Sequence, residues 1–315
     1  MKCLKIAFVG VGSIATRHIK NVSTYLSREG YFFSIDVFRS GFGHALSPDI
    51  DSIVSVVYLA SDDVVTDYDV VFITNPTSLH FDTLIKFQNK GKFFFIEKPV
   101  FSNVNENLER LDSIDPSKCY VACPLRYNPV IEYLKSNQDL LNQAFAIRAI
   151  SSSYLPDWRK GIDYRKCYSA HKAQGGGVDI DLIHEWDYIT FLFGKMSTGY
   201  CISDKISNLE IDSYDIAIYL ARNPQITVEM HLDYFGRKPI RELQLFTKED
   251  TINCDILNGK ISFLKSNKSI KFTDERNAYQ MKEIIHFFDI VFGRIDSDST
   301  IEHAIMVLNY AKGDF

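Results

Sequence analysis

The chain has 315 residues, which is enough for about two domains. Apolar residues make up 46% of it and charged residues 24%, and the formal net charge is −5. This composition excludes a disordered chain, a collagen-like chain and a small disulfide-rich protein. The slightly acidic balance argues against a nucleic-acid-binding protein. Aromatic residues reach 13%, so a large core can form with aromatic surface left over for a ligand or a partner subunit.

No targeting or membrane segment is recognisable. The apolar run from Ile6 to Val11 is too short for a signal-peptide core and is interrupted by Gly10, and the other apolar runs are of strand length. The six cysteines form no CxxC pair and no zinc-like spacing with histidine. We therefore expect reduced thiols in a cytoplasmic protein, with a structural disulfide as the alternative, and no metal site.

The first 122 residues alternate between short apolar runs and helical periodicity. We expect strands over residues 5–9, 32–38, 70–74, 93–96 and 119–122, and helices over 13–28, 76–89 and 103–111. Strand and helix in strict turn are typical of βαβ units. The pattern predicts an α/β domain with a doubly wound parallel sheet.

From residue 123 to residue 315 the pattern changes to that of an α+β domain. We expect helices over 129–134, 175–193, 277–292 and 300–311, and strands over 144–154, 200–206, 214–221, 227–234, 241–246, 251–255 and 260–264. Consecutive strands with short turns indicate an open, mainly antiparallel sheet flanked by helices. The last helix can pack back on the first domain.

A glycine-rich segment joins the first strand to the first helix. Residues 10–15 read G-x-G-x-x-A, a weak pattern alone but one placed here as a dinucleotide-binding loop requires. Gly10 permits the tight turn, Gly12 lets the backbone approach a pyrophosphate, and Ala15 allows close packing of helix on strand. The alternative is a glycine-rich turn without a ligand.

The end of the second strand bears on the choice of cofactor. NAD-binding domains usually carry an acid there for the ribose hydroxyls, but this chain has Phe38, followed by Arg39 and Ser40. Asp36 is expected to lie within the strand. Because Arg39 can pair with a 2′-phosphate, we expect NADP(H) as the cofactor. NAD(H) is the alternative.

Two further motifs carry candidate chemistry. Glu97-Lys98-Pro99 follows the strand over 93–96, so Lys98 should emerge at the carboxyl edge of the sheet, where open α/β sheets bind ligands. In the expected helix over 175–193, Asp181 and His184 are three residues apart and should share one face. The alternatives are a surface lysine in a turn and a structural histidine.

Together these segments resemble the Gfo/Idh/MocA family of glucose–fructose oxidoreductase and inositol dehydrogenase. The resemblance covers most of the chain and rests on GVGSIATRH (10–18), TNPTSLH (74–80), EKP (97–99), CPLRYNP (123–129) and GGGVDIDLIHEWD (175–187). It implies a Rossmann domain, a second domain whose open sheet pairs subunits into a homodimer or homotetramer, and hydride transfer between NAD(P) and a hydroxyl carbon of a sugar or cyclitol. It also implies Lys98, Asp181 and His184 as the catalytic residues.

The resemblance and the loop chemistry together give a set of expected cofactor-binding residues. They are Gly10, Gly12, Ser13, Ile14, Ala15, Arg39, Ser40, Thr74, Asn75, Pro76, His80, Glu97 and Lys98. For His80 a structural role is the equal alternative. One departure from the family concerns Asp181, because many members place the acid four residues before the histidine, where this chain has Ile180. The alternative to a substrate contact is that Asp181 orients His184.

The segment 154–165 is long, mixed aromatic and charged, and suits a substrate-binding loop. We expect substrate contacts from Arg126, Tyr127, Trp158, Arg159, Tyr164, Asp181 and His184. The leading hypothesis is an NAD(P)-dependent sugar or sugar-acid dehydrogenase or reductase. The alternatives are NAD-dependent glycoside hydrolysis and a non-catalytic dinucleotide sensor. Substrate identity, the carbon oxidised and the direction of reaction stay open.

Overall fold

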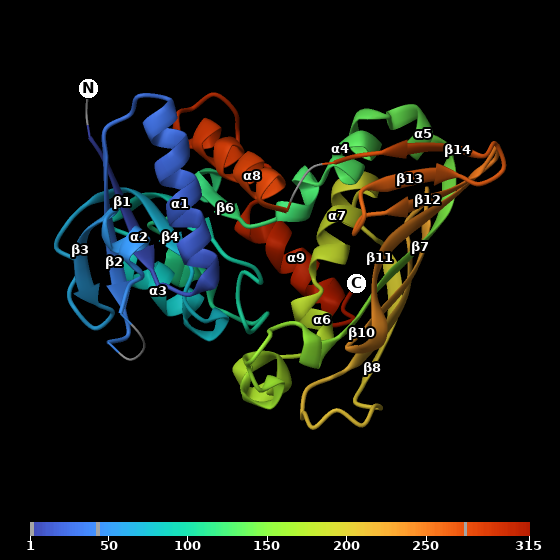
Figure 1. Cartoon of the computed structure of the whole chain (residues 1–315), viewed down its shortest axis with the longest axis horizontal. Coiled ribbons are helices and arrows are strands. Elements are labelled where there is room, and N and C mark those ends of the chain that lie inside the picture. Colours follow the sequence, from blue (N-terminus) through green and yellow to red (C-terminus); the bar gives the residue numbers. More distant parts are fainter. Residues whose placement is uncertain (1–2, 42–44, 274–275) are drawn as a thin grey trace. The chain divides into compact units, whose positions relative to one another are not determined.

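The computed structural model describes residues 3–41, 45–273 and 276–315, which fall into two compact units (Figure 1). Unit 1 contains the described residues up to Ala122 together with Gln280–Ile305. Unit 2 contains those of Cys123–Tyr279 together with Met306–Phe315. Residues 280–305, which the sequence analysis assigned to the second domain, thus count with the first.

Unit 1 is built on a parallel sheet with the strand order β3-β2-β1-β4-β5-β6. This is the order of a doubly wound dinucleotide-binding fold. The strands are β1 (Leu4–Val9), β2 (Phe33–Arg39), β3 (Val54–Leu59), β4 (Tyr68–Ile73), β5 (Gly91–Ile96) and β6 (Cys119–Val121). The helices of this part are α1 (Ser13–Arg28), α2 (Pro48–Asp51), α3 (His80–Phe87) and α8 (Arg276–Val291). The expected parallel sheet is confirmed, with β3 as an additional edge strand.

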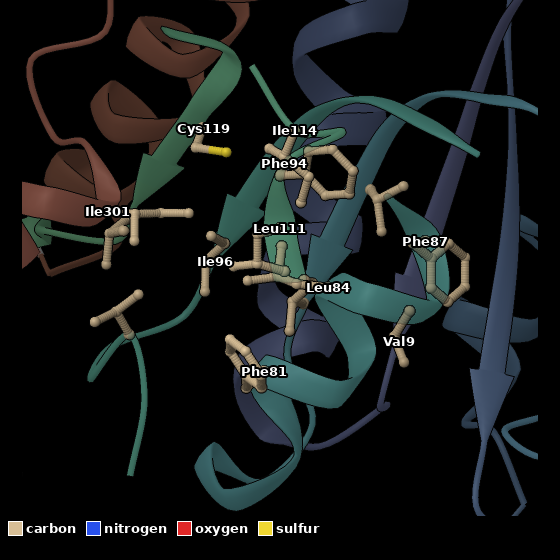
Figure 2. Packing of buried hydrophobic residues seen from close by; sticks show 14 of the residues in the cluster. Val9, Phe81, Leu84, Phe87, Phe94, Ile96, Leu111, Ile114, Cys119 and Ile301 are labelled. Carbon is tan, nitrogen blue, oxygen red and sulfur yellow. The ribbon is translucent and has the colours of Figure 1, made fainter. Parts of the chain in front are cut away.

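Alternation along the buried strands assigns their side chains to two cores. On one face Phe72 stacks between Phe8 and Phe95, and Phe287 of α8 meets Phe72 edge-on. On the other face α3 contributes its apolar side chains to a cluster with β1, β4 and β5, shown in Figure 2. Helices on both faces leave the carboxyl edge of the sheet as the place where loops gather.

Unit 2 is built on a sheet with the order β14-β13-β12-β11-β7-β10-β9-β8, antiparallel except for the parallel pair β7 and β10. Its strands are β7 (Ala144–Tyr154), β8 (Thr198–Asp204), β9 (Ile216–Arg222), β10 (Thr227–Asp233), β11 (Phe235–Thr247), β12 (Thr251–Asp255), β13 (Lys260–Phe263) and β14 (Lys268–Lys271). The mainly antiparallel sheet is confirmed.

The helices of unit 2 cover the buried face of this sheet. They are α4 (Pro129–Ser136), α5 (Gln138–Gln143), α6 (Val178–Asp181), α7 (His184–Phe193) and the last part of α9 (Ile301–Ala311). Trp186 of α7 meets Tyr219 of β9 edge-on at 5.3 Å, and Tyr310 packs on the same indole. No helix among the described residues has the length and apolarity that a membrane span needs.

Two helix predictions were wrong. Residues 103–111 form only a short 3₁₀ turn at Leu108–Leu111, because the side chains of Asn103 and Asn107 accept from backbone N–H groups two residues on and hold turns instead. The expected helix over 175–193 is broken into α6 and α7 at Leu182, whose φ and ψ are −99° and 26°.

Candidate active site

The glycine-rich loop lies at the carboxyl end of β1. Gly10 has φ +88°, and a Cβ there would lie 2.5 Å from Cα of Asn75, so only glycine fits the close approach. A Cβ on Gly12 would meet nothing within 4 Å. Gly12 precedes α1, whose first N–H groups have no side-chain cap. An open space above uncapped N–H groups suits the pyrophosphate of a dinucleotide.

The segment after β4 closes against this loop. The Thr74 hydroxyl donates to the backbone oxygens of Gly10 at 2.7 Å and Val9 at 3.1 Å. Asn75 donates from Nδ2 to Thr83 of α3 at 2.7 Å. Thr74 is buried and Pro76 is exposed. Thr74 and Asn75 therefore shape the loop, and Pro76 lies at the surface beside it.

The end of β2 carries no acidic residue. Phe38 is buried and stacks on Tyr58 at 4.9 Å, and Asp36 accepts from the hydroxyl of Tyr68 at 2.9 Å. Arg39 is partly exposed and Ser40 is exposed. As expected from the sequence, the acid of β2 lies within the strand and does not reach its carboxyl end.

The Glu97-Lys98-Pro99 turn follows β5 at the same edge. Glu97 accepts from Nε2 of His18 at 2.7 Å and from the backbone N–H of Lys98 at 3.3 Å. Burial by itself raises the pKa of Glu97. The hydrogen bond from His18 and the charges around the carboxylate, those of His18, Lys98 and His80, outweigh it and hold the pKa below the usual value. Glu97 is therefore an ionised group next to Lys98.

His80 lies behind this turn and is almost fully buried. Its Nδ1 lies 3.2 Å from the backbone oxygen of Pro99 and 3.1 Å from that of Val100, and its Nε2 lies 3.0 Å from the backbone oxygen of Asn75. Burial lowers the pKa of the His80 ring. Each ring nitrogen faces a backbone oxygen, and a neutral ring donates from one of the two nitrogens, so the buried ring is placed to hold these segments.

In unit 2 the helix break separates the two other candidate catalytic residues. Asp181 ends α6 and is buried, whereas His184 begins α7 and is partly exposed. Gly176, just before α6, packs directly against the backbone of Tyr168. A Cβ at this position would lie 2.1 Å from the backbone oxygen of Tyr168, so a side chain does not fit there. Asp181 and His184 therefore do not lie on one continuous helix, although the sequence predicted a single helix over 175–193.

Two tyrosines that the sequence analysis missed surround Asp181. The hydroxyl of Tyr234 donates to Oδ2 of Asp181 at 2.6 Å. Burial raises the pKa of Tyr168 and Tyr234, and in each case the charge of Asp181 and a hydrogen bond to it raise it further. Both phenols therefore stay protonated and can donate to the carboxylate. The only sequence signal for Tyr234 was its place at the end of a predicted strand.

The expected substrate loop folds against the same tyrosines. Trp158 donates from Nε1 to Ser153 at 2.9 Å and meets Tyr234 edge-on at 5.2 Å, while the guanidinium of Arg159 lies 5.6 Å from the ring centre of Tyr168. A cavity of about 10 Å³ lies beside Trp158, Arg159 and Tyr164, room for about one water. The structure thus brings Trp158 and Arg159 close to the surroundings of Asp181.

Arg126 does not fit the expected role as a substrate contact. It is 4% exposed, and its Nε and Nη2 donate to the two carboxylate oxygens of Asp187 at 3.0 and 2.6 Å. The guanidinium also lies 4.8 Å from the ring centre of Phe191. The charge of Arg126 is therefore paired with Asp187 of α7, and the bidentate pair fixes the position of that helix. The neighbouring Tyr127 is partly exposed.

No group of three or more His, Cys, Asp or Glu side chains that could hold a metal occurs in the part of the chain that the structure describes. All six cysteines lie in that part and are reduced. The candidate residues fall into two sets, one at the carboxyl edge of the unit 1 sheet and one around Asp181 and His184 in unit 2.

Comparison with known proteins identifies relatives for both the sequence and the fold. Residues 4–123 match the model of the GFO_IDH_MocA oxidoreductase family, which has an NAD-binding Rossmann fold. The scyllo-inositol 2-dehydrogenase (NAD(+)) of Bacillus subtilis (strain 168) is 28% identical over 149 residues, which cover 44% of this chain and 40% of that protein. The match therefore spans less than half the length of this curated relative.

Two solved structures match over nearly the whole chain. A levoglucosan dehydrogenase in complex with NADH gives a TM-score of 0.82 at 14% identity, covering 99% of this chain and 96% of that one. The WlbA dehydrogenase from Bordetella pertussis, in complex with NADH and UDP-GlcNAcA, gives 0.75 at 13% identity, covering 99% and 95%. The fold of both units is thus that of these dehydrogenases, and residues 4–123 are similar to the NAD-binding Rossmann domain of the Gfo/Idh/MocA oxidoreductase family.

Proposed function

We propose that this protein is an NAD(H)-dependent dehydrogenase or reductase that acts on a CH–OH group of a sugar, a cyclitol or a related derivative. The observation that carries the proposal is the shared position of the glycine-rich loop and Lys98. Both follow parallel strands of one sheet, β1 and β5, so both lie at its carboxyl edge. A dinucleotide held by the loop and a cationic side chain at the same edge suit hydride transfer from a hydroxyl-bearing carbon or to a carbonyl carbon.

A bound nicotinamide cofactor supplies the hydride acceptor or donor. Within the chain, His184 is suited to take the hydroxyl proton in oxidation and return it in reduction, because imidazole titrates near neutral pH. Lys98 is suited to attract the substrate oxygen as charge develops on it. Each of the two side chains is partly exposed, so solvent or a ligand can reach both.

Asp181 is proposed as a positioning residue. Its carboxylate already accepts from Tyr234, and it ends the short helix directly before the turn that leads to His184. A carboxylate fixed by a hydroxyl donor places a negative charge near the start of α7 in a defined position. This assignment agrees with the spacing in the sequence, where Asp181 stands one position away from the acid of many family members.

NAD(H) is proposed in place of the NADP(H) expected from the sequence. The family is described as NAD-binding, and the curated relative and both solved structures are named with NAD(+) or NADH. NADP(H) was expected because Phe38 stands in place of the acid and Arg39 supplies a cation. Binding assays with NADH and NADPH distinguish the two, and NADPH binding that is tenfold tighter would restore the original assignment.

A polyhydroxylated ring is the proposed substrate class. Trp158 is 36% exposed and is held at both its indole nitrogen and its ring edge, so it offers a rigid aromatic face to a sugar. Arg159 and Tyr164 line the same small cavity. That cavity alone is far too small for a sugar, so these side chains are proposed as one wall of a larger site.

The proposal is tested by incubating the purified chain with NAD⁺ or NADP⁺ and a panel of cyclitols, sugars and nucleotide sugars. Formation of reduced nicotinamide with at least one of them is expected. Cleavage of a glycoside without net formation of reduced nicotinamide would instead support the hydrolase alternative. Cofactor binding without turnover of any member of the panel would support the sensor alternative.

We also propose that two copies of the chain associate through the outer face of the unit 2 sheet. Paired residues of β8 and β9 place four apolar side chains on that face: Tyr200 opposite Leu220, and Ile202 opposite Ile218. Tyr200 is 80% exposed and Ile202 is 69% exposed. Contiguous apolar surface of this kind is typical of subunit interfaces. The reduced cysteines support a cytoplasmic location, as proposed from the sequence.

A further inference from the structure

Two buried histidines lie behind the Lys98 turn and take no part in the proton chemistry proposed above. His18 of α1 and His80 of α3 are each 1% exposed. Neither can reach a ligand from such a position. Their partners are therefore informative about what they hold in place.

His18 is joined to the turn through Glu97. Its Nε2 lies 2.7 Å from Oε1 of Glu97, a residue 79 positions further along the chain, and Oε2 of Glu97 accepts from the backbone N–H of Lys98. The carboxylate thus bridges the helix that opens at the glycine-rich loop and the backbone of Lys98. This contact couples the candidate cofactor loop to the candidate catalytic turn within one unit.

The aromatic core fixes the ring of His18. The ring of Phe95 meets it edge-on at 5.0 Å, and that of Phe72 lies tilted at 6.1 Å. Because both phenylalanines belong to the stacked core of the sheet, His18 cannot turn away from Glu97 without disturbing that core. The hydrogen bond to Glu97 is therefore held in one geometry.

The protonation of Glu97 decides which group donates. Its pKa is below the usual value, so at neutral pH it is ionised and can only accept. Nε2 of His18 must then carry the proton. The charged or titratable groups that act on Glu97 are His18 of α1, His80 of α3 and its own neighbour Lys98.

His80 holds the other side of the same turn. It lies between the backbone oxygen of Asn75, after β4, and the backbone oxygens of Pro99 and Val100, which follow Lys98. The residues before Lys98 are therefore fixed by Glu97 and those after it by His80. Lys98 stands between two buried supports.

We propose that His18, acting through Glu97, is a positioning residue that sets the backbone of Lys98 at the carboxyl edge of the sheet, with His80 as the second support of the turn. The catalytic part of this inference rests on the proposed function. The positional part does not, since it concerns contacts within unit 1 alone.

The experiment compares His18→Asn with His18→Gln in the full chain. The amide nitrogen of glutamine can reach the place of Nε2 and keep the donor to Glu97, whereas that of asparagine is one methylene too short. His286→Gln is the matched control. Its Nε2 pairs with Asp298 at 2.9 Å in a more exposed position and outside the turn. Glu97→Gln removes the charge and keeps the shape.

Two readouts are needed. Amide hydrogen exchange of the peptide that contains Lys98 reports on the turn without any need for turnover. Steady-state kinetics against pH, with the NADH dissociation constant measured separately, report on the reaction. If His18 served overall stability alone, its replacement would not move the acid limb of the pH profile. It would also not lower kcat while leaving the NADH dissociation constant unchanged.

For His18→Asn we expect about tenfold faster exchange at Lys98, a kcat lowered about tenfold and an NADH affinity within about threefold of wild type. The acid limb of kcat should move to higher pH, because burial raises the pKa of Glu97 once its donor is lost. Glu97→Gln should also show faster exchange at Lys98, but its kcat should lack that acid limb, because glutamine has no carboxylate to protonate. His18→Gln should recover most of the wild-type values, and His286→Gln should match wild type throughout.

Unchanged exchange at Lys98 and an unchanged acid limb in His18→Asn would overturn the inference. Equal defects in His18→Asn and His18→Gln would also overturn it, since the reach of the donor would then be irrelevant. If the wild-type chain turned over no compound of the panel, the proposed function would fail. The exchange experiment would still decide whether His18 positions Lys98.

Discussion

The hydroxyl of Tyr234 and the carboxylate of Asp181 come from residues 53 positions apart and meet at 2.6 Å in a buried setting. A buried carboxylate is costly unless donors satisfy it, so this hydroxyl both stabilises unit 2 and fixes Asp181. The ring of Tyr234 also meets the indole of Trp158 edge-on. One tyrosine therefore connects the candidate substrate wall to Asp181, the proposed positioning residue.

Replacing Tyr234 by phenylalanine should lower the free energy of unfolding by about 1–3 kcal/mol and lower kcat, because Asp181 loses a donor while the packing is kept. Tyr188→Phe is the matched control. The hydroxyl of Tyr188 is buried and finds no hydrogen-bond partner among the described residues, so its loss should be neutral or stabilising. Urea unfolding and steady-state kinetics of both variants check this, and equal losses in the two would contradict it.

The buried pair of Arg126 and Asp187 makes a second prediction at this scale. Removing one partner in Arg126→Met leaves Asp187 as a poorly solvated charge, so unfolding should become easier by about 3–5 kcal/mol. The measurement is urea unfolding of unit 2, followed by the exposure of Trp186. If Arg126→Met kept wild-type stability but raised the KM for substrate, the original assignment of Arg126 as a substrate contact would be preferred.

At the scale of elements, the junction of β1 and α1 is defined by two glycines with different tasks. Gly10 is needed for its left-handed backbone and its close approach to Asn75. Gly12 has φ −93° and open space where a side chain would point. The first glycine thus serves the fold, and the second is the one that we propose for binding a ligand.

Alanine at each position should separate these tasks. Gly10→Ala should destabilise unit 1 by about 2 kcal/mol or more, because it combines a positive φ with a backbone clash. Gly12→Ala should fold normally but bind NADH at least about tenfold more weakly, because its methyl group would occupy the path of the pyrophosphate. Thermal unfolding and NADH titration of both variants provide the check. Unchanged NADH binding in Gly12→Ala would mean that the loop does not hold a dinucleotide.

At the scale of the whole molecule, the outer face of the unit 2 sheet carries the apolar side chains of β8 and β9. Tyr200→Lys combined with Ile202→Lys should convert a dimer to a monomer, since two charges would be buried in the interface. Ser269→Lys, on the exposed strand β14, is the control and should leave the assembly unchanged. Light scattering after gel filtration measures this, and a monomeric wild-type chain would contradict the proposed interface.

Sequence patterns predicted those features that depend on neighbouring residues. The loop at Gly10 and Gly12, the lysine turn after β5 and the change of sheet type after residue 122 all follow from local periodicity and from glycine chemistry. The edge strand β3 was missed, because Val56, Val57 and Leu59 do not alternate with polar residues and are exposed at the edge.

The supports of the site could not be predicted in this way, because they are pairs of residues far apart in the chain. Glu97 meets His18, and Asp181 meets Tyr234, through the folding of whole units. The break at Leu182 is similar. Helical periodicity continues through residues 178–193, but Asp181 is bound by Tyr234, between β10 and β11, and α7 begins at His184.

The rate of reduced nicotinamide formation by wild type, Lys98→Ala and His184→Ala, on a substrate found in the panel, tests the proposed hydride transfer most directly. We predict that both variants bind NADH within about threefold of wild type and lose about a hundredfold or more in kcat. Both side chains are partly exposed, so their loss should leave the fold intact. Turnover by either variant at the wild-type rate would contradict the proposed roles of Lys98 and His184.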